Sequence, residues 1–179
     1  MKQTIYKVFF IWIAVMTTSC ASNDIQMYSE QQPLMDVREY FDGDIEGWGF
    51  VQDWRGKVVR RFDIDMKGSW QGDTGTLEES FRYYDGVTQE RRWTLTRADE
   101  SNFVGAASDV ESFNFGRMSG NMMHMSYQLE VPYKEGSISL KLDDRLWLFN
   151  DGVVINKTKM TKFGLPVGSL TVFMKKIES

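Results

Sequence analysis

Cysteine and histidine are almost absent from the sequence, which has one of each, Cys20 and His124, in 179 residues. This inventory excludes a zinc site built from cysteines or from several histidines. No Gly-x-Ser-x-Gly nucleophile elbow accompanies the lone histidine. The longest apolar run, Val8 to Met16, is shorter than the roughly 20 apolar residues that span a bilayer. The sequence therefore lacks the signatures of the commonest metal sites, hydrolases and membrane-spanning helices.

Positive charge is also in short supply, because 21 Lys and Arg stand against 25 Asp and Glu. The formal net charge of −4 becomes −6 if Lys2 and Lys7 are removed with a leader. Such a chain gives no electrostatic case for binding nucleic acid. It is long enough for one domain with a substantial core.

The first residues have the pattern of a signal peptide: Lys2 and Lys7, a short apolar run, and then small residues. Thr-Thr-Ser at 17–19 leads directly into Cys20. This pattern resembles a lipobox, the bacterial lipoprotein signal, and the resemblance implies that Cys20 is acylated and begins the mature chain. The alternative is an ordinary secretory signal with an incidental cysteine. A lone thiol is a liability in an oxidising compartment, whereas an acylated one is not.

The lipobox resemblance also sets the expected domain organisation. Residues 1–19 form a signal peptide, residues 20–33 an acylated N-terminus and polar tether, and residues 34–179 a single domain. Several acyl chains anchor a protein stably. Ala21 follows the cysteine in place of aspartate, which by the same resemblance implies the outer membrane of a Gram-negative bacterium, with the domain facing the periplasm. We expect the membrane as a partner, and neither nucleic acid nor a cofactor.

From Asp44 onward the sequence consists of short alternating runs separated by Gly and Asp-Gly turns. The run 58–66 places apolar residues on one face, and the run 123–131 does the same. We count nine or ten strands, with Asp143-Asp144 interpreted as a turn. A single small domain with this many strands closes into a barrel or folds into a sandwich, and the meander of hairpins favours an all-β, antiparallel barrel.

The hairpin over 76–95 illustrates how the pattern selects a register. A two-residue Asp-Gly turn would mix apolar and charged residues on both faces. A three-residue loop at 84–86 instead places Leu77 opposite Trp93 and leaves one mostly apolar face. We therefore predict the three-residue loop, because a slip by one residue exchanges the faces of a strand. The Asp-Gly pair within 149–153 predicts a second hairpin.

Three segments carry a resemblance to a known family: FDGDIEGWGFVQDWRGKVVRRF, LEESFRYYDG followed by RRW, and DDRLWLFNDGVVINKTKMTKFGLPVGSLTVF. They span Phe41 to Phe173, most of the chain, in the expected order. The sequence resembles bacterial lipoproteins of domain-of-unknown-function family 3833. The resemblance implies a lipocalin-like barrel and a connection with lipids, and it brings no assigned activity.

Charged residues on otherwise apolar faces mark the candidate site. An unpaired charge inside a barrel is costly, so Arg60, Glu79 and Arg91 either anchor the polar head of a ligand or include a structural Glu79–Arg91 pair. Ligand pockets are mostly apolar with a few polar groups, and an Arg can hold a carboxylate or phosphate through two hydrogen bonds. The candidate ligand-binding residues are Arg60, Glu79, Phe81, Tyr83, Arg91, Trp93, Met123, Met125 and Tyr127.

Two further clusters have competing interpretations. Thioethers and an imidazole can bind Cu(I), but His124 and the methionines beside it alternate along a strand, so we expect no metal site. The methionines either fill the core or line a lipid cavity. No acid interrupts the chain from Lys157 to Lys176, and these lysines either meet anionic head groups or form a solvated face.

These observations leave three functional hypotheses. The first is a membrane-anchored lipoprotein whose barrel binds or carries a hydrophobic ligand, such as a lipid or fatty acid. The second is an envelope structural or interaction lipoprotein with a filled barrel. The third, an enzyme acting on lipid-like substrates, is the least supported because no catalytic signature accompanies it. A barrel of about eight strands can be packed solid or hold one small ligand, so strand count does not decide between the first two.

Overall fold

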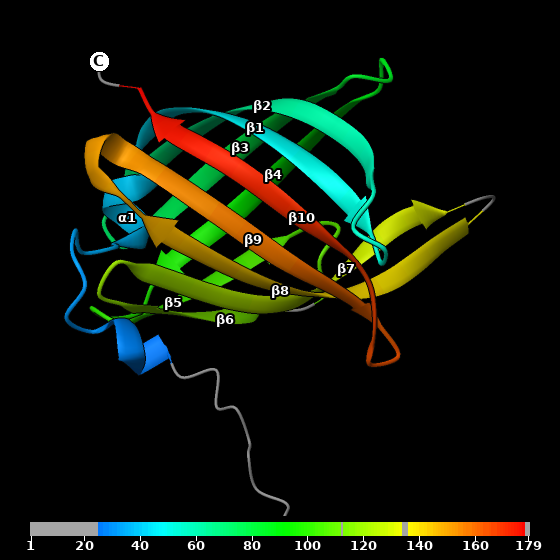
Figure 1. The fold of residues 1–179 in the computed structure, drawn as a ribbon. Coiled ribbons are helices and arrows are strands. Elements are labelled where there is room, and N and C mark those ends of the chain that lie inside the picture. The colour runs from blue at the N-terminus through cyan, green and yellow to red at the C-terminus, as the bar shows by residue number, and fades with distance from the viewer. Residues whose placement is uncertain (1–24, 112, 134–135, 178–179) are drawn as a thin grey trace, which may run out of the picture.

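Ten antiparallel strands join into one closed ring, in the order β1-β10-β9-β8-β7-β6-β5-β4-β3-β2 (Figure 1). The computed structural model describes residues 25–111, 113–133 and 136–177. The strands are β1 Gly43–Asp53, β2 Val58–Gln71, β3 Thr74–Tyr83, β4 Thr88–Arg97, β5 Asn102–Ala107, β6 Asn114–Ser119, β7 Met122–Tyr133, β8 Gly136–Leu148, β9 Val153–Lys162 and β10 Leu165–Lys176. The predicted antiparallel β-barrel is confirmed.

The N-terminal residues divide at position 25. The expected signal peptide, Cys20 and the start of the expected tether lie outside the described residues. Residues 25–33, also expected in the tether, begin with the 3-10 helix η1, Ile25–Tyr28, which lies against β6 and β7. The physical reason is apolar contact, because Ile25 is buried and the ring of Tyr28 meets that of Trp147 edge-on at 6.4 Å.

The alternating runs of the sequence form the inner wall of the barrel. On β2, Phe62, Ile64 and Met66 point inward and are buried, as the alternation predicts. On β7, Met123, Met125 and Tyr127 do the same. None of the helices in the described part of the chain has the length and apolar character needed to cross a bilayer.

The β3–β4 hairpin has the predicted register. Leu77 pairs with Trp93, and Glu79 pairs with Arg91. The loop has three residues, with Gly86 at a φ of 87°, a left-handed conformation that glycine adopts without strain. The second predicted Asp-Gly hairpin joins β8 to β9 through the 3-10 helix η2, Asn150–Gly152.

The Asp143-Asp144 pair is not the turn that we expected from the sequence. β8 runs without interruption through both residues. Asp143 pairs with Ser126 of β7, and Asp144 pairs with Met125. The strand continues because each carboxylate finds polar partners on its own side of the wall, so adjacent acids do not force a turn.

Aromatic rings cover glycines on neighbouring strands at three places in the wall. A Cβ added to Gly49 would lie 2.2 Å from the ring of Phe62, and one added to Gly116 would lie 2.0 Å from the ring of Phe103. Gly75 and Trp70 repeat the arrangement at 2.4 Å. Each ring lies on its cross-strand glycine, a device that lets bulky residues pack in a strongly curved sheet.

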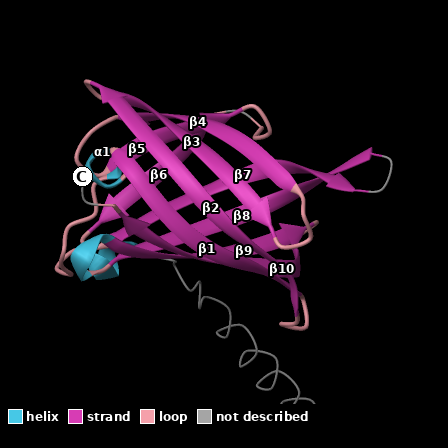
Figure 2. Cartoon of the chain, turned by 90° about the horizontal axis from the view of Figure 1, so that it is seen from above, coloured by secondary structure: helices cyan, strands magenta, loops and turns pink. Residues whose placement is uncertain are grey.

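The two ends of the barrel differ. The short helix α1, Val37–Tyr40, lies across one end, which we call the helical end (Figures 1 and 2). Asp36 caps α1 by accepting hydrogen bonds from the backbone N–H groups of Arg38 and Glu39, at 2.8 and 3.1 Å. The described C-terminus lies at the same end, where the Ile177 N–H donates to the Asp44 carbonyl. The opposite end, the far end, carries the β1–β2, β3–β4, β5–β6, β7–β8 and β9–β10 connections.

Candidate ligand-binding site

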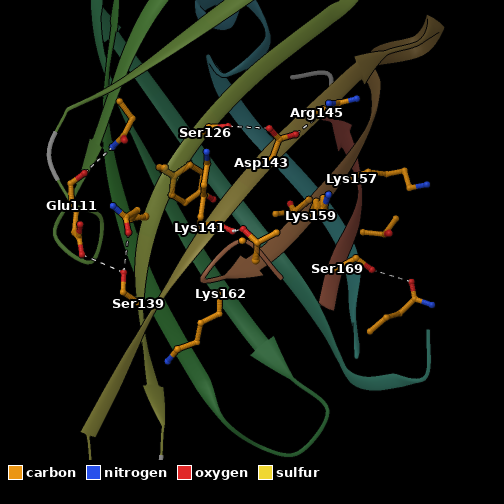
Figure 3. Close-up of a pocket in the computed structure, with 18 of the residues that line it drawn as sticks. Glu111, Ser126, Ser139, Lys141, Asp143, Arg145, Lys157, Lys159, Lys162 and Ser169 are labelled. Atoms are coloured by element: carbon orange, nitrogen blue, oxygen red, sulfur yellow. Dashed lines mark hydrogen bonds and ion pairs between the residues drawn. The ribbon is translucent and has the colours of Figure 1, made fainter. Parts of the chain in front are cut away.

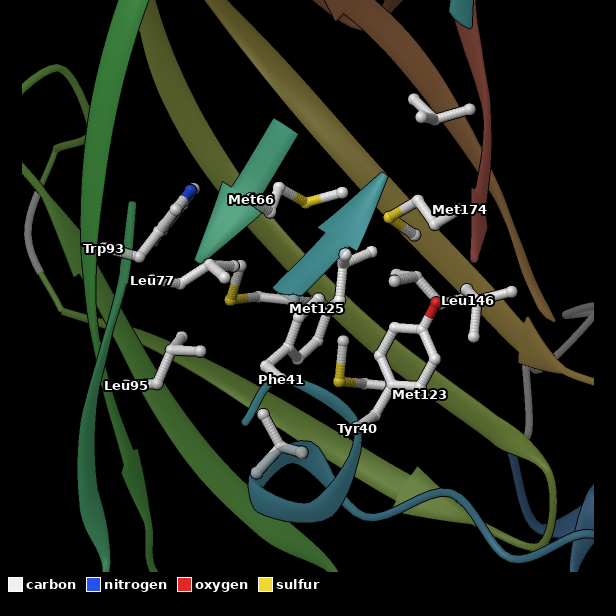
Figure 4. Packing of buried hydrophobic residues seen from close by; sticks show 14 of the residues in the cluster. Tyr40, Phe41, Met66, Leu77, Trp93, Leu95, Met123, Met125, Leu146 and Met174 are labelled. Atoms are coloured by element: carbon white, nitrogen blue, oxygen red, sulfur yellow. The ribbon is translucent and has the colours of Figure 1, made fainter. Parts of the chain in front are cut away.

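An internal cavity of about 110 Å³ lies inside the barrel at the level of Leu77 and Leu146. Its lining is mostly apolar and includes Val37 of α1 as well as inward-facing residues of eight strands, β2 to β5 and β7 to β10. Four methionines contribute flexible walls: Met66, Met123, Met125 and Met174. Figure 4 shows these side chains gathered inside the barrel around Phe41. The cavity is therefore an apolar space with deformable walls, bounded at one end by α1.

Arg91 is the centre of a buried charge cluster on the wall of this cavity. Its side chain is 12% exposed, and its guanidinium lies 2.8 Å from a carboxylate oxygen of Asp109. Glu79 lies 3.6 Å away on the adjacent strand, close enough for ion pairing but too far for a good hydrogen bond. The Glu79–Arg91 pair expected from the sequence is present, with Asp109 as a third member.

Asp144 belongs to the same polar region, on the other side of Tyr127. The Tyr127 hydroxyl donates a hydrogen bond of 2.9 Å to Asp144 Oδ2. The second carboxylate oxygen, Oδ1, is buried and has no hydrogen-bond partner among the described residues. Asn156 Oδ1, which also lines the cavity, has none either, and Glu79 Oε2 has only its ion pair of 3.6 Å with Arg91. The site thus contains several buried acceptor atoms without a hydrogen bond in the described chain, with the buried Thr158 hydroxyl as a neighbouring donor.

Burial dominates the proton affinities of the two acids. It raises the pKa of Glu79 to about 7, against the attraction of Arg91. It also raises the pKa of Asp144 to about 6, opposed by the neighbouring hydroxyls of Thr158 and Tyr127. Burial lowers the pKa of Arg91, but the carboxylates of Glu79 and Asp109 outweigh it, so the pKa rises. Near neutral pH the cluster therefore holds a permanent cation beside acids that titrate.

The structure separates the predicted site residues into two groups. Seven of the nine line the cavity: Glu79, Phe81, Arg91, Trp93, Met123, Met125 and Tyr127. Arg60 and Tyr83 do not line it. Arg60 forms an ion pair of 2.8 Å with Asp85 and lies over the ring of Tyr83, 3.5 Å from its centroid. Both belong to the far end of the barrel, because Arg60 stands near the start of β2.

Three polar residues of the site escaped the sequence analysis. Asp144 could have been found by parity, since it alternates with the inward-facing Leu142 and Leu146 once β8 is read as one strand. Asn156 follows the same rule two residues after Val154 of β9. Asp109 lies in the β5–β6 connection, and no periodic signal marks it. Its position comes from the packing of that connection on β7, where the Glu130 N–H donates to the Asp109 carbonyl.

Comparison with known proteins places the chain in a family. The family model described as Protein of unknown function (DUF3833) matches residues 14–176. The chain belongs to this family. No curated protein matches it. The S-type phycobiliprotein lyase CPES from Guillardia theta has a similar structure, with a TM-score of 0.55 and 11% identity over 81% of this chain and 94% of that chain. At this identity the likeness shows the lipocalin-like fold alone.

This DUF3833 barrel also has a wide hollow of about 1340 Å³ on its outer wall, over β7 to β10 (Figure 3). Its cations are Lys141, Arg145, Lys157, Lys159 and Lys162, and its acids are Glu111 and Asp143. The two acids already have partners, because Ser139 donates to Glu111 and Arg145 pairs with Asp143. The surface is therefore net positive on a chain whose overall charge is −4. Lys175 and Lys176, expected in the same cluster, lie at the helical end.

The lone histidine is part of an outer-face cluster with no catalytic order. His124 Nε2 and the Ser126 hydroxyl both lie 3.0 Å from Asp143 Oδ2. A serine hydrolase needs the histidine between the serine and the aspartate, whereas here the aspartate is in the middle. In the described ranges, no three His, Cys, Asp or Glu residues are grouped as metal ligands. The cluster fits a role in fixing the β7–β8 wall.

Proposed function

We propose that this chain is a membrane-anchored carrier whose barrel binds the end of a hydrophobic ligand, such as a lipid. One observation carries the proposal: an apolar internal cavity whose wall includes buried, unsatisfied polar atoms. Ligand sites are typically apolar concavities with a small number of placed polar groups. A filled structural barrel would have no use for acceptors without donors, because each costs about 1–3 kcal/mol.

The size of the cavity limits what it holds without rearrangement. At about 110 Å³ it is smaller than the roughly 150 Å³ cavity that binds benzene in a protein core. It accommodates a short stretch of alkyl chain. A longer chain requires the methionines to change rotamer, which unbranched thioether side chains do readily, or α1 to move away from the helical end.

The anchor is the second half of the proposal. We propose that Cys20 is acylated and holds the barrel to the outer membrane, facing the periplasm. The support is the sequence pattern before Cys20, together with the position of the first described residues at the helical end. A periplasmic carrier of this kind would take up its ligand from one lipid surface and release it at another.

Binding is tested with a matched alkyl series on the acyl-free Cys20→Ser chain. Isothermal titration calorimetry with butyl, hexyl and octyl compounds should show saturable binding. Leu146→Phe, which fills the cavity, should abolish it, whereas Val59→Phe, on the exposed outer face, should not. The proposal fails when both measurements are negative: no member of the series binds, whatever its head group, and native mass spectrometry of the protein from its host envelope shows no bound ligand.

The anchor is tested separately by fractionation. Wild-type protein should sediment with outer membranes, and its N-terminal peptide should carry acyl chains by mass spectrometry. Cys20→Ser should move to the soluble or unprocessed fraction. A wild-type N-terminal peptide that retains a free Cys20 thiol would contradict the anchor without bearing on ligand binding.

A further inference from the structure

The charge on Arg91 is already neutralised. Asp109 lies 2.8 Å and Glu79 3.6 Å from its guanidinium. An incoming carboxylate would have to displace one of these partners and leave it buried and unpaired, which is strongly unfavourable. Arg91 is therefore a structural counter-ion, and it does not offer the bidentate anchor for an acid that the sequence pattern suggested.

Three acceptor atoms on the cavity wall lack a hydrogen bond, and one of them, Glu79 Oε2, has only the long ion pair of 3.6 Å with Arg91. Asp144 Oδ1, Glu79 Oε2 and Asn156 Oδ1 are buried on the cavity wall without a hydrogen bond. They come from three different strands, β8, β3 and β9. Asp144 is only 8% exposed, and its one cationic neighbour in the region, Arg91, is already engaged by other acids. The buried Thr158 hydroxyl lies beside Asp144 and can satisfy one of these acceptors. The region still has more free acceptors than this one donor can satisfy, and the negative charge of Asp144 has no dedicated cation.

We infer that the cavity receives the hydrogen-bond-donating end of a hydrophobic ligand, an amine or a hydroxyl, and disfavours a carboxylate. This inference rests on the proposed function and specifies the chemistry of its ligand. An ammonium group would satisfy Asp144 in both charge and hydrogen bonding, and a hydroxyl would satisfy one acceptor. A fatty acid entering carboxylate-first would meet acceptors and negative charge.

Binding of an amine should depend on pH. The charged or titratable groups that face the cavity region are Glu79 of β3, Arg91 of β4, Asp109 of the β5–β6 connection, Tyr127 of β7 and Asp144 of β8. Burial raises the pKa of Asp144 to about 6, so this acid is mainly neutral at pH 5 and ionised at pH 7.5. An amine, which is cationic at both values, should bind more tightly at the higher pH.

The test compares hexylamine, 1-hexanol and hexanoate by calorimetry on the Cys20→Ser chain at pH 5 and 7.5. At pH 7.5 hexylamine should bind about tenfold or more tightly than hexanoate, since hydrogen bonds to charged groups contribute about 1.5–3 kcal/mol. Asp144→Asn should reduce this preference and its pH dependence while retaining 1-hexanol. Glu79, whose pKa is about 7, ionises over the same interval, so the remaining pH dependence should disappear when Glu79→Gln is added. Asp143→Asn, one residue away and facing outward, is the matched control and should change neither.

Equal or tighter binding of hexanoate overturns the inference and leaves the carrier function standing. So does a hexylamine preference that is undiminished in Asp144→Asn. Failure of all three compounds counts instead against the proposed function. Circular dichroism and a thermal melt of each variant confirm that the barrel is intact, and Glu79→Gln provides a second variant if Asp144→Asn does not fold.

A second, independent observation concerns the far end of the barrel. Four of its connections have a strongly exposed aromatic residue at or next to the tip: Trp54, Tyr84, Phe113 and Phe163 are 67%, 58%, 75% and 92% exposed. The turns at the helical end are built differently, from residues such as Gly72-Asp73 and Gly120-Asn121. Four strongly exposed aromatic residues are thus gathered at the connections of one end, whereas Phe149 at the helical end is 47% exposed.

Cations accompany these aromatic tips. Arg55 lies over Trp54 at 4.5 Å, Arg61 over Tyr84 at 4.9 Å, and Lys162 over Phe163 at 5.1 Å. Phe163 also has a φ of 51°, a left-handed conformation that is unfavourable for a bulky residue. Gly164, the next residue, has a φ of 79°, so the two form the positive-φ pair of a tight hairpin turn between Lys162 and Leu165. The turn accounts for the backbone conformation, and it leaves the ring of Phe163 92% exposed.

We propose that the far end docks on an anionic lipid surface. Aromatic side chains are enriched at the membrane–water interface, and neighbouring Arg and Lys side chains can reach the head-group phosphates. The positive outer hollow, which includes Lys162 and Phe163 on its rim, extends the same charge along the wall. Attraction to anionic lipid is worth about 1 kcal/mol per basic residue near the surface.

Vesicle co-sedimentation with the Cys20→Ser chain tests this surface. Binding to phosphatidylcholine vesicles should increase when phosphatidylglycerol is added and should fall with salt. The triple variant Trp54→Ser, Tyr84→Ser and Phe163→Ser should lose most of it, whereas Phe149→Ser, an exposed aromatic at the helical end, should not. The proposal is overturned if the triple variant binds as well as the Cys20→Ser chain, or if the Cys20→Ser chain binds neither kind of vesicle.

Discussion

Tyr127 and Asp144 are joined inside the barrel by a hydrogen bond of 2.9 Å, while the preceding residue, Asp143, bonds to His124 on the outside. One strand thus places adjacent carboxylates in opposite environments. Burial raises the pKa of Asp144. Asp143 is also partly buried, which raises its pKa, but hydrogen bonds from His124 and Ser126 outweigh this and hold it below the usual value. Adjacent acids in this wall have different chemistry because of strand parity alone.

Stability should fall as pH rises from about 4 to about 7. The folded-state pKa of Glu79 is about 7 against an ordinary value of 4.5, so the folded chain binds more protons than the unfolded chain in this window, and unfolding becomes easier with rising pH. Urea titrations at pH 5 and 7.5 measure the difference. Glu79→Gln should reduce it, and Glu78→Gln, which faces solvent on the same strand, should not. If the free energy of unfolding changes equally between pH 5 and 7.5 in the two variants, the assignment of the pH dependence to Glu79 is refuted.

Arg91→Met should strongly destabilise the barrel. It leaves the carboxylates of Glu79 and Asp109 buried without a cation, and breaking a buried pair in this way costs about 3–5 kcal/mol. Arg92→Met removes the same side chain from an exposed pair with Glu78 and should change stability by at most about 1 kcal/mol. Chemical denaturation of both variants makes the comparison. Similar losses in the two would show that Arg91 is not a central counter-ion.

Gly116→Ala should disturb the ring that covers it. The added Cβ would lie 2.0 Å from Phe103, which is 1% exposed and has no free space to enter. Overpacking of this kind costs about 1–3 kcal/mol. Phe103→Leu on the same background should cost less than it does alone, because the clash is removed. Gly136→Ala, where the added atom meets nothing within 4 Å, is the control in a thermal melt.

Asp36→Ala should loosen the helical end. Asp36 caps α1 and forms an ion pair of 2.9 Å with Arg97, and loss of an N-cap acceptor costs about 1 kcal/mol. Hydrogen exchange of the Tyr40 and Phe41 amides, which bond to Asp36 and Val37 carbonyls, should speed up. Asp42→Ala provides an acid-to-alanine control nearby. Unchanged exchange in Asp36→Ala would mean that barrel packing alone holds α1.

The barrel wall was accessible from the sequence because period-two alternation is a local property. The runs around Phe62 and Met125 fix the inner face, and the turn chemistry of Gly86 fixes a hairpin register. The polar cluster was only partly accessible. Glu79 and Arg91 pair across one hairpin, so a local pattern reveals them. Asp109 lies two residues beyond the Trp93–Ala107 pair of β4 and β5, but it follows the end of β5, where no alternation marks its direction. Ile25 shows a similar limit, since no sequence pattern indicates that it is buried.

The separation of the two ends gives the barrel a second use as a spacer. The described chain begins at the helical end, and the aromatic tips lie at the other. A strand of 14 residues such as β2 is about 46 Å long before tilt is considered, at 3.3 Å per residue. A domain held through its N-terminus therefore points Trp54 and Phe163 away from its attachment by most of its own length. The distance between its attachment and the aromatic tips would include the length of a rigid barrel.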